Sequence, residues 1–476
     1  MSNHLLFSSA TTHWSHLLNA QRLGSVKKPK TGATARSHFH KDYDRLVFSH
    51  SFRQLNQKTQ VHPLTNQLGI HTRLTHSLEV SCIGRSLGMM AAEKLHDKID
   101  SGLPAGISPA DVGVIVQAAC LAHDIGNPPF GHAGEYAIRD WFRRADSQAV
   151  LQSLSINEQL DLLAYEGNAQ GFRLLARNEH HPDKGGMRLT CATLGAFMKY
   201  PWLATDSNDV KDINDTSGNR SVQKFGCFYS EADQLAVLAA SLHLPRSKQH
   251  DGFARHPLAY LLEAADDICY ALIDLEDGIN LNMLTYADVA SIFYELIGER
   301  PSSIHVPAHM SVRQSLASLR ARAMMRLVNT VTDAFVANND AMLAGILQGS
   351  LFTHCDTSVQ NGINQAKQLA REKIFNHPSK VRMELMANQC LHRLLDAFMP
   401  LAWTGGQTAS MSSAFMSFEQ QRLLSLLQPH LNEHRRELGN DTYLNILNVL
   451  DFITGMNDHE AYRLAQELQG HWGTVV

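Results

Sequence analysis

The sequence predicts an all-α fold. Apolar residues recur three and four positions apart through most of the 476-residue chain, which is the spacing of a buried helix face. No stretch of useful length alternates apolar and polar residues as a half-buried strand does, and no internal repeat or low-complexity tract is present. A chain of this length can bury one large core or form two to three ordinary domains.

Composition narrows the class of protein. The hydrophobic fraction of 44% and the charged fraction of 18% are typical of a soluble globular protein. The net charge of -4 excludes a surface that is basic throughout, although a local basic patch stays open. None of the 7 Cys has zinc-ligand or redox spacing, which suits a reducing cytosol. No run approaches the ~20 apolar residues of a membrane span, and no secretory signal is evident, so we expect a cytoplasmic protein.

The first helices follow an irregular lead-in, which we expect over residues 1–40. One helix is expected to begin at Asp42, and a second spans roughly residues 72–96. Arg73 and His76 are three positions apart, so they share a face of the second helix. A histidine in such a position is more often a hydrogen-bonded core residue than a ligand.

The chain is organised around residues 119–135. The helix that leads into this stretch is predicted to take Ser108 as its N-cap. Gly126 and the prolines after it end the helix, so His123 and Asp124 are predicted to lie in its last turn. In a chain with 26 His, a His-Asp pair alone is usually a structural or surface feature. A buried imidazole beside a carboxylate nevertheless needs partners, and a divalent metal would satisfy both.

A second informative helix covers residues 261–278. Asp266, Tyr270 and Asp274 are four positions apart, so they fall on one face. An acidic stripe is usually solvated, but this one runs beside a strongly apolar stripe and includes a tyrosine, which favours a cavity lining. The remaining segments predicted from periodicity are a helical stretch over 133–200, a polar surface loop over 205–222, and helices over 231–243, 381–398, 417–436 and 441–470.

The order His76, then His123 with Asp124, then Asp266 is the signature of HD-domain phosphohydrolases. The sequence resembles one branch of them, the bacterial deoxyguanosine-triphosphate triphosphohydrolases and their dGTPase-like relatives. The likeness runs along most of the chain. It is carried by blocks at residues 42–53, 58–61, 72–80, 123–132 and 263–268, with further similarity at 14–24 and 451–456.

The resemblance implies an HD-domain helical fold with additional C-terminal helices. An HD catalytic core would cover residues 41–300, and a C-terminal helical region over 301–476 would pack on it. Relatives cleave between the α-phosphorus and the 5′ oxygen, so the implied reaction is metal-dependent hydrolysis of deoxynucleoside triphosphates, dGTP or several dNTPs, to deoxynucleoside and intact triphosphate.

The resemblance also implies roles for single residues. Four would ligate the metal: His76, His123, Asp124 and Asp266. His132 and Glu135, which can share a helix face, would form an acid/base pair beside the α-phosphate. The residues implied for substrate binding are Arg73, Lys199, Tyr200 and Arg45 toward the phosphates, and Tyr270, Asp274 and Gln60 toward the sugar.

Two departures from the family pattern matter. Gln54 stands where many relatives have a second arginine, and residues 61–70 vary in the family, so base preference does not carry over. The nitrogen and oxygen ligands suit Mn²⁺, Mg²⁺, Fe²⁺ or Co²⁺. Whether His132 acts as acid or base stays open.

Alternative functions stay open from the sequence. The chain could be another HD phosphohydrolase, acting on nucleoside monophosphates or guanosine tetraphosphate, or a regulator that binds nucleotide or single-stranded DNA. The intact ligand set argues against a site that has lost its chemistry. By analogy with relatives we expect a homo-oligomer. Single-stranded DNA as a further partner stays open, and no membrane association is expected.

Overall fold

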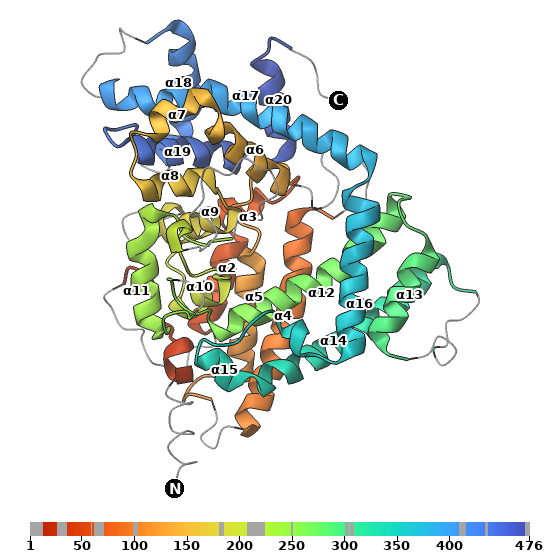
Figure 1. Ribbon diagram of the computed structural model, residues 1–476. Helices are drawn as coiled ribbons and strands as arrows, with labels where there is room; N and C mark the ends of the chain where they lie inside the picture. The colour runs from red at the N-terminus through yellow and green to blue at the C-terminus, as the bar shows by residue number, and fades with distance from the viewer. Residues whose placement is uncertain are drawn as a thin grey trace.

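The structure is a computed structural model that describes residues 13–25, 36–58, 60, 71–98, 103–179, 185–206, 224–248, 251–299, 304, 309–408, 416–433 and 437–471. It is all-α: within these ranges only isolated β-bridges occur beside the helices (Figure 1). No helix in the described part of the chain is long and apolar enough to cross a membrane.

The first half of the chain forms the helices around the central stretch. These are α2 (His38–Val47), α3 (His50–Arg53), α4 (Arg73–Lys98), α5 (Pro109–Ala122), α6 (His132–Arg143), α7 (Ala145–Leu151), α8 (Ile156–Leu163), α9 (Gly167–Arg173), α10 (Cys191–Phe197) and α11 (Ala232–Leu242). Short π or 3-10 turns lie at η1 (Leu174–Asn178), η3 (Ala204–Asp206) and η5 (Tyr229–Glu231).

The second half continues in the same way. Its helices are α12 (Pro257–Asn280), α13 (Tyr286–Ile297), α14 (Val312–Ala337), α15 (Asn339–Leu343), α16 (Thr357–Leu369), α17 (Pro378–Thr408), α18 (Phe418–Glu433), α19 (Thr442–Gly455) and α20 (Asp458–Glu467). A 3-10 turn lies at η7 (Leu351–His354). The π-helical turn η8 (Ala370–Phe375) joins directly onto the end of α16.

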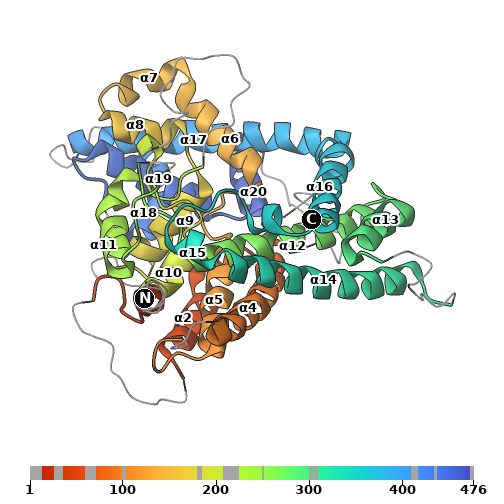
Figure 2. The ribbon, with the colours of Figure 1, turned by 60° about the horizontal axis from the view of Figure 1, so that its bottom comes forward.

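Buried side chains form two hydrophobic clusters. The first gathers around α4, α5, α12 and α14, and the second joins α6 and α8 to α17, α19 and α20. Figures 1 and 2 show these two groups of helices as neighbouring halves of the molecule. The division into residues 1–40, 41–300 and 301–476 stays a prediction, although α13, α14 and α16 share the first cluster with the central helices.

Helix α5 is the buried centre of the first cluster. Ser108 is its N-cap, as predicted, and Ser108 and Asp111 form a reciprocal capping box with Pro109 as the first helical residue. Every residue from Val112 to Ala122 is buried, and α4, α10 and α12 pack around it. An all-apolar helix surrounded by others is the expected result of such a sequence.

Three predicted segments are divided differently in the structure. The stretch 133–200 is not one continuous helical run, because Arg144 and Glu166 are extended and new helices begin after them. The stretch 441–470 is two helices, since Asn457 caps α20 with Glu460 in a second capping box. The first helix begins at His38, with Ser37 as its N-cap, rather than at Asp42. Most of the predicted loop 205–222 lies outside the described residues.

A buried ionic network ties the two clusters together. The Arg173 guanidinium, at the end of α9, lies 3.0 Å from Asp451 of α19 and 2.8 Å from Glu231. Gln170 and Asn178 also donate to the Asp451 carboxylate, at 2.6 and 2.9 Å. Each carboxylate oxygen of Asp451 therefore accepts at least two hydrogen bonds, and the network holds α19 against α9.

Candidate active site

Three helices bring four potential metal ligands together. His76 comes from the first turn of α4, His123 and Asp124 follow the end of α5, and Asp266 lies on α12. Asp266 Oδ1 is 3.1 Å from His76 Nε2 and 3.5 Å from His123 Nε2, and Asp124 Oδ2 is 3.6 Å from His123 Nε2. Ligand atoms of His76, His123 and Asp124 lie within 4.8 Å of one another, which is close enough to share one ion.

The donors fit a divalent metal. Asp124 Oδ2 is buried and has no hydrogen-bond partner, an arrangement that is costly for a carboxylate unless a cation lies beside it. His123 Nδ1 lies 2.7 Å from the carbonyl of Cys120, and this contact fixes the ring so that Nε2 points at the carboxylates. Burial opposes ionisation of Asp266, but Lys199 and the two imidazoles hold its pKa well below the usual range.

The loop after α5 is held tightly from within. Asn127 donates its side-chain amide to Asp124 Oδ1 at 2.8 Å, and Arg73 Nη1 lies 2.6 Å from the same oxygen. Gly126 has φ +99°, and a Cβ there would overlap the backbone nitrogen of Gly171, so only glycine fits. The orientation of Asp124 is thus set by the Asn127 amide and the Arg73 guanidinium.

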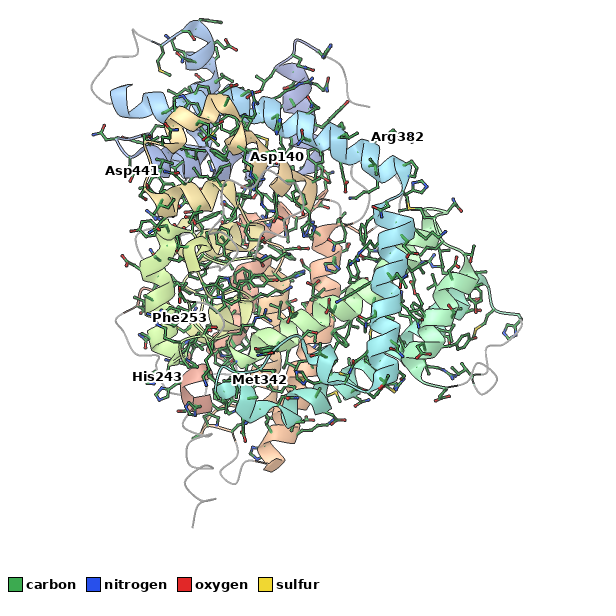
Figure 3. All side chains as sticks on the ribbon, viewed as in Figure 1. Asp140, His243, Phe253, Met342, Arg382 and Asp441 are labelled. Carbon is green, nitrogen blue, oxygen red and sulfur yellow. The ribbon has the colours of Figure 1, made fainter. Side chains whose placement is uncertain are left out.

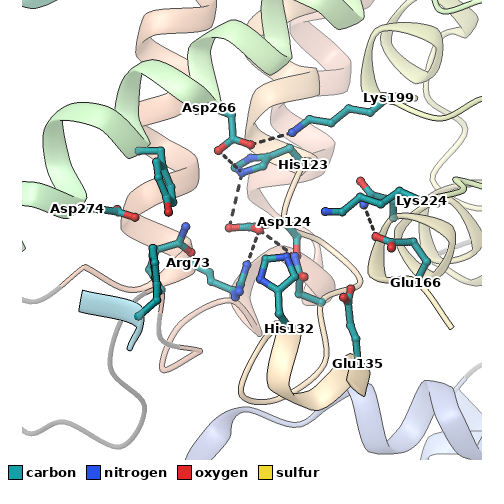
Figure 4. A pocket seen from close by; sticks show the side chains of 15 residues that line it. Arg73, His123, Asp124, His132, Glu135, Glu166, Lys199, Lys224, Asp266 and Asp274 are labelled. Atoms are coloured by element: carbon teal, nitrogen blue, oxygen red, sulfur yellow. Dashed lines mark hydrogen bonds and ion pairs between the residues drawn. The ribbon is translucent and has the colours of Figure 1, made fainter. Parts of the chain in front are cut away.

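A polar cavity of about 350 Å³ opens beside this cluster (Figure 4). Three cationic side chains line it, Arg73, Lys199 and Lys224, and Lys199 Nζ is also 2.7 Å from Asp266 Oδ2. Asn168 adds an amide to the same wall. Cations and amide donors around one cavity suit a polyanionic ligand.

His132 lies at the start of α6 and lines the cavity. Burial, together with the positive charges of Lys224 and Arg73, lowers its pKa to about 4, so the imidazole is neutral at pH 7. The predicted partner Glu135 is engaged elsewhere: its Oε1 accepts the Gly167 N–H at 2.8 Å, and its Oε2 is 3.6 Å from Arg139. Glu135 therefore binds the start of α9, and because it also lines the cavity, its pairing with His132 stays a prediction.

The predicted substrate residues divide into two groups. Gln60, Tyr270 and Asp274 line the cavity with Arg73 and Lys199, and burial raises the pKa of Asp274 to about 7. Arg45 and Tyr200 are not among the cavity-lining residues.

Arg45 and Tyr200 make other contacts. Arg45 donates to the carbonyls of Met187 and Arg188, at 3.1 and 2.6 Å. The Tyr200 ring packs edge-on against Trp202 at 5.5 Å and lies beneath the Arg255 guanidinium. In this structure neither side chain is in place to touch a ligand in the cavity.

Several lining residues were missed from the sequence. Asn127 follows Gly126 in the loop after α5, which marks a loop and no more, and Asn168 lies in the first turn of α9. Glu166 and Lys224 have no spacing relation to the metal ligands, and only the fold brings them to the cavity. Phe375, from η8, stacks on Tyr270 with the ring centroids 5.9 Å apart and the planes at 18°.

Comparison with known proteins gives a consistent result. The HD domain family matches residues 73–192. A protein described as deoxyguanosinetriphosphate triphosphohydrolase-like from Pseudomonas aeruginosa is 44% identical over 96% of this chain and 98% of its own length. One so described from Synechocystis sp. is 38% identical over 96% and 99% of the two chains. The deoxyguanosinetriphosphate triphosphohydrolase of Salmonella typhimurium is 32% identical over 76% of each chain.

Proposed function

The chain belongs to the deoxyguanosinetriphosphate triphosphohydrolase-like family of HD-domain proteins, and we propose that it hydrolyses deoxynucleoside triphosphates to deoxynucleoside and intact triphosphate. The substrates are dGTP or several dNTPs. The observation that carries the proposal is that one cavity is lined both by three of the potential metal ligands, His123, Asp124 and Asp266, and by three cationic side chains.

We assign the metal to His76, His123, Asp124 and Asp266. Their nitrogen and oxygen donors suit Mn²⁺, Mg²⁺, Fe²⁺ or Co²⁺. When bound, such an ion polarises a phosphoryl oxygen and lowers the pKa of water. Asp124 Oδ2 supports this assignment, since it is buried without a hydrogen-bond partner and lies 3.6 Å from Nε2 of His123, another potential ligand.

The cations of the cavity would hold the triphosphate. Arg73, Lys199 and Lys224 line one cavity, so together they offset much of the charge of a triphosphate. Asp274 and Gln60 would hold the 3′-hydroxyl of the sugar, and Tyr270 would pack beneath the ring. Arg45 and Tyr200 contribute to the shape of the site only indirectly, given the contacts they make in this structure.

The reaction needs one proton to move. The oxygen of water bonds to the α-phosphorus, the bond from that phosphorus to the 5′ oxygen breaks, and the 5′ oxygen leaves with a proton. His132 is neutral at pH 7, so it can accept a proton of the attacking water and pass it to the departing 5′ oxygen. Glu135 positions the start of α9 beside the cavity through Gly167.

Product analysis tests the proposal. Purified protein is incubated with dGTP and Mn²⁺, and the products are separated by ion-exchange chromatography. Deoxyguanosine with tripolyphosphate is expected. Monophosphate with diphosphate would move the cleaved bond, and turnover of guanosine tetraphosphate or nucleoside monophosphates alone would favour another HD phosphohydrolase. No turnover with any of these would favour a binding role.

Two partner predictions accompany the function. A homo-oligomer is expected by analogy with relatives, and binding of single-stranded DNA stays open. Light scattering coupled to gel filtration and a fluorescent oligonucleotide titration at several salt concentrations would test them, because phosphate contacts weaken as salt rises.

A further inference from the structure

The loop between Asp124 and His132 is held from outside by residues far along the chain. We infer that Lys58 and Asp458, acting with the corner between α19 and α20, are positioning residues for the catalytic loop. The inference rests on the proposed function for its kinetic consequence. The hydrogen bonds that carry it are independent of that function.

Lys58 connects three segments. It is 3% exposed, and its ammonium donates to the carbonyl of Asn127 at 2.8 Å and to that of Thr454, near the end of α19, at 2.6 Å. Its own carbonyl accepts the Arg73 N–H at 2.8 Å. One side chain and its backbone therefore link the loop, the start of α4 and the C-terminal helices.

Asp458 holds the other half of the loop. Its carboxylate is 1% exposed and accepts the Phe130 N–H at 2.8 Å. Phe130 and Gly131 both have positive φ, of 65° and 61°, and non-glycine residues seldom adopt this conformation without support. The carboxylate therefore stabilises the turn from which α6 starts at His132.

The start of α20 fixes Asp458 itself. Asn457 caps the helix, and its backbone N–H and that of Glu460 exchange hydrogen bonds with each other's side chains at 3.0 and 2.9 Å. Asp458 is therefore presented from a rigid helix end. A rigid support of this kind is what precise placement of a reactive side chain needs.

The position of the loop matters because Asp124, a proposed metal ligand, lies at one end and His132, the proposed proton-transfer residue, lies at the other. A Cβ on Gly131 would overlap the Arg73 guanidinium, so the turn also sets how closely that cation approaches. A displacement of about 1 Å of reacting groups can cost about 10²-fold in rate. Loss of either clamp is thus expected to lower kcat more than it raises KM.

The test compares Asp458→Ala, Asp458→Asn and Lys58→Met with Tyr443→Phe as the matched control. Tyr443 is on α19, the helix whose Thr454 carbonyl accepts from Lys58, and its hydroxyl donates to Asp161 at 2.5 Å, so the control loses a buried hydrogen bond of that helix without touching the loop. We expect kcat for dGTP to fall about 10- to 100-fold in the Ala and Met variants, with KM within about threefold. Asp458→Asn keeps an acceptor oxygen and should retain kcat within about threefold of wild type. Tyr443→Phe should lower Tm and leave kcat unchanged.

Amide hydrogen exchange at Phe130 gives a readout that does not depend on turnover. In the wild-type chain this amide should be protected, and Asp458→Ala should abolish the protection while Asp458→Asn keeps it. An unprotected Phe130 amide in the folded wild type overturns the inference, even if the Ala and Met variants fail to fold. An unchanged kcat in folded Asp458→Ala, or an equal fall of kcat in Tyr443→Phe, also overturns it. A wild type without dNTP hydrolysis would overturn the proposed function, and exchange would still decide whether Asp458 holds the loop.

Discussion

Two buried clusters of charge in this molecule differ in how completely their groups are paired. Around Arg173, the guanidinium contacts Asp451 and Glu231, and both carboxylates accept further hydrogen bonds. Around Asp124, one carboxylate oxygen, His76 Nδ1 and Arg73 Nε are buried without a partner. In the first cluster the charged groups are paired and the amide oxygens of Gln170 and Asn178 have no hydrogen-bond partner, whereas in the second the unpartnered atoms belong to two potential metal ligands and the Arg73 cation. Paired charges hold the fold together, and unpartnered ligand atoms are arranged for something that binds.

The largest expected effect is a loss of turnover at the charge cluster around Asp124, while the stability of that cluster is kept. His132→Ala should lower dGTP turnover by about 10²–10⁴-fold, as loss of a proton-transfer group does. Metal content, measured by atomic emission, should be unchanged, because His132 lies outside the ligand set. A variant that loses metal together with activity would make His132 a ligand or a structural residue.

Variants of the charge cluster around Arg173 should have the opposite effect, a loss of stability. Asp451→Leu leaves Arg173 partly uncompensated and should lower the free energy of unfolding by about 3–5 kcal/mol, measured by urea denaturation. Pairing it with Arg173→Met should recover part of this loss, since both charges are then gone. A double variant no more stable than Asp451→Leu alone would contradict the view that Asp451 and Arg173 serve only to neutralise each other.

Bound metal should stabilise the folded chain only through the charge cluster around Asp124. Free Mn²⁺ at about 100 times its Kd should raise the free energy of unfolding by about 2.7 kcal/mol, seen as a higher Tm that a chelator reverses. Asp124→Asn should remove the shift, and Tyr443→Phe should show it in full. A shift that survives Asp124→Asn would place the ion elsewhere.

Selectivity for the deoxy sugar tests which residue of the cavity wall lies against the sugar. Tyr270 lies one turn after Asp266 on α12 and stacks on Phe375, which leaves little room for a 2′-hydroxyl. Tyr270→Ala should therefore reduce the preference for dGTP over GTP by about tenfold, equivalent to ~1.4 kcal/mol. The ratio of the two kcat/KM values measures this, and an unchanged ratio in a folded, metal-loaded variant would move the discrimination to another residue.

A further effect concerns pH. Burial raises the pKa of Asp161 to about 8, although Tyr443 and the Tyr229 N–H donate to it. Between about pH 4 and 8 the folded chain keeps a proton that the unfolded chain releases, so this group's stabilising contribution is complete at low pH and is lost as pH rises. Asp161→Asn should flatten the dependence by about 1 kcal/mol per pH unit between pH 6 and 8. Equal slopes in urea denaturation of both proteins would contradict the raised pKa.

The sequence was most informative where local rules decide the structure. Ser108 and Pro109 mark the start of α5, and the apolar run after them predicts its burial, which the structure confirms. The structure brings the four expected metal ligands together, although His123 and Asp124 follow the end of α5 instead of lying in its last turn. Such features depend on neighbours within a few positions or on a motif with a fixed order.

Long-range contacts could not be predicted in this way. Arg45 has the charge that a phosphate-binding residue needs, but its guanidinium donates to the backbone carbonyls of residues 187 and 188. Lys224 and Glu166 enter the cavity only because the fold brings their segments there. The break between α19 and α20 depends on Asn457, a cap that periodicity alone does not reveal. Arg45, Lys224 and Glu166 thus depend on residues far away in sequence, whereas the Asn457 cap is a local feature that the apolar period does not contain.

The number of residues in the π-helical turn η8 determines which side chain lines the cavity. A π turn carries one residue more than an α-helical turn over the same path, and such insertions often occur at functional sites. Phe375, the last residue of η8, owes its place against Tyr270 to that extra residue. Deleting one position between Ala370 and Ile374 would restore the α-helical period and turn the following side chain by about 100°. Evolution could therefore exchange the residue that faces the ligand by an insertion or deletion in this turn, without any substitution in the wall itself.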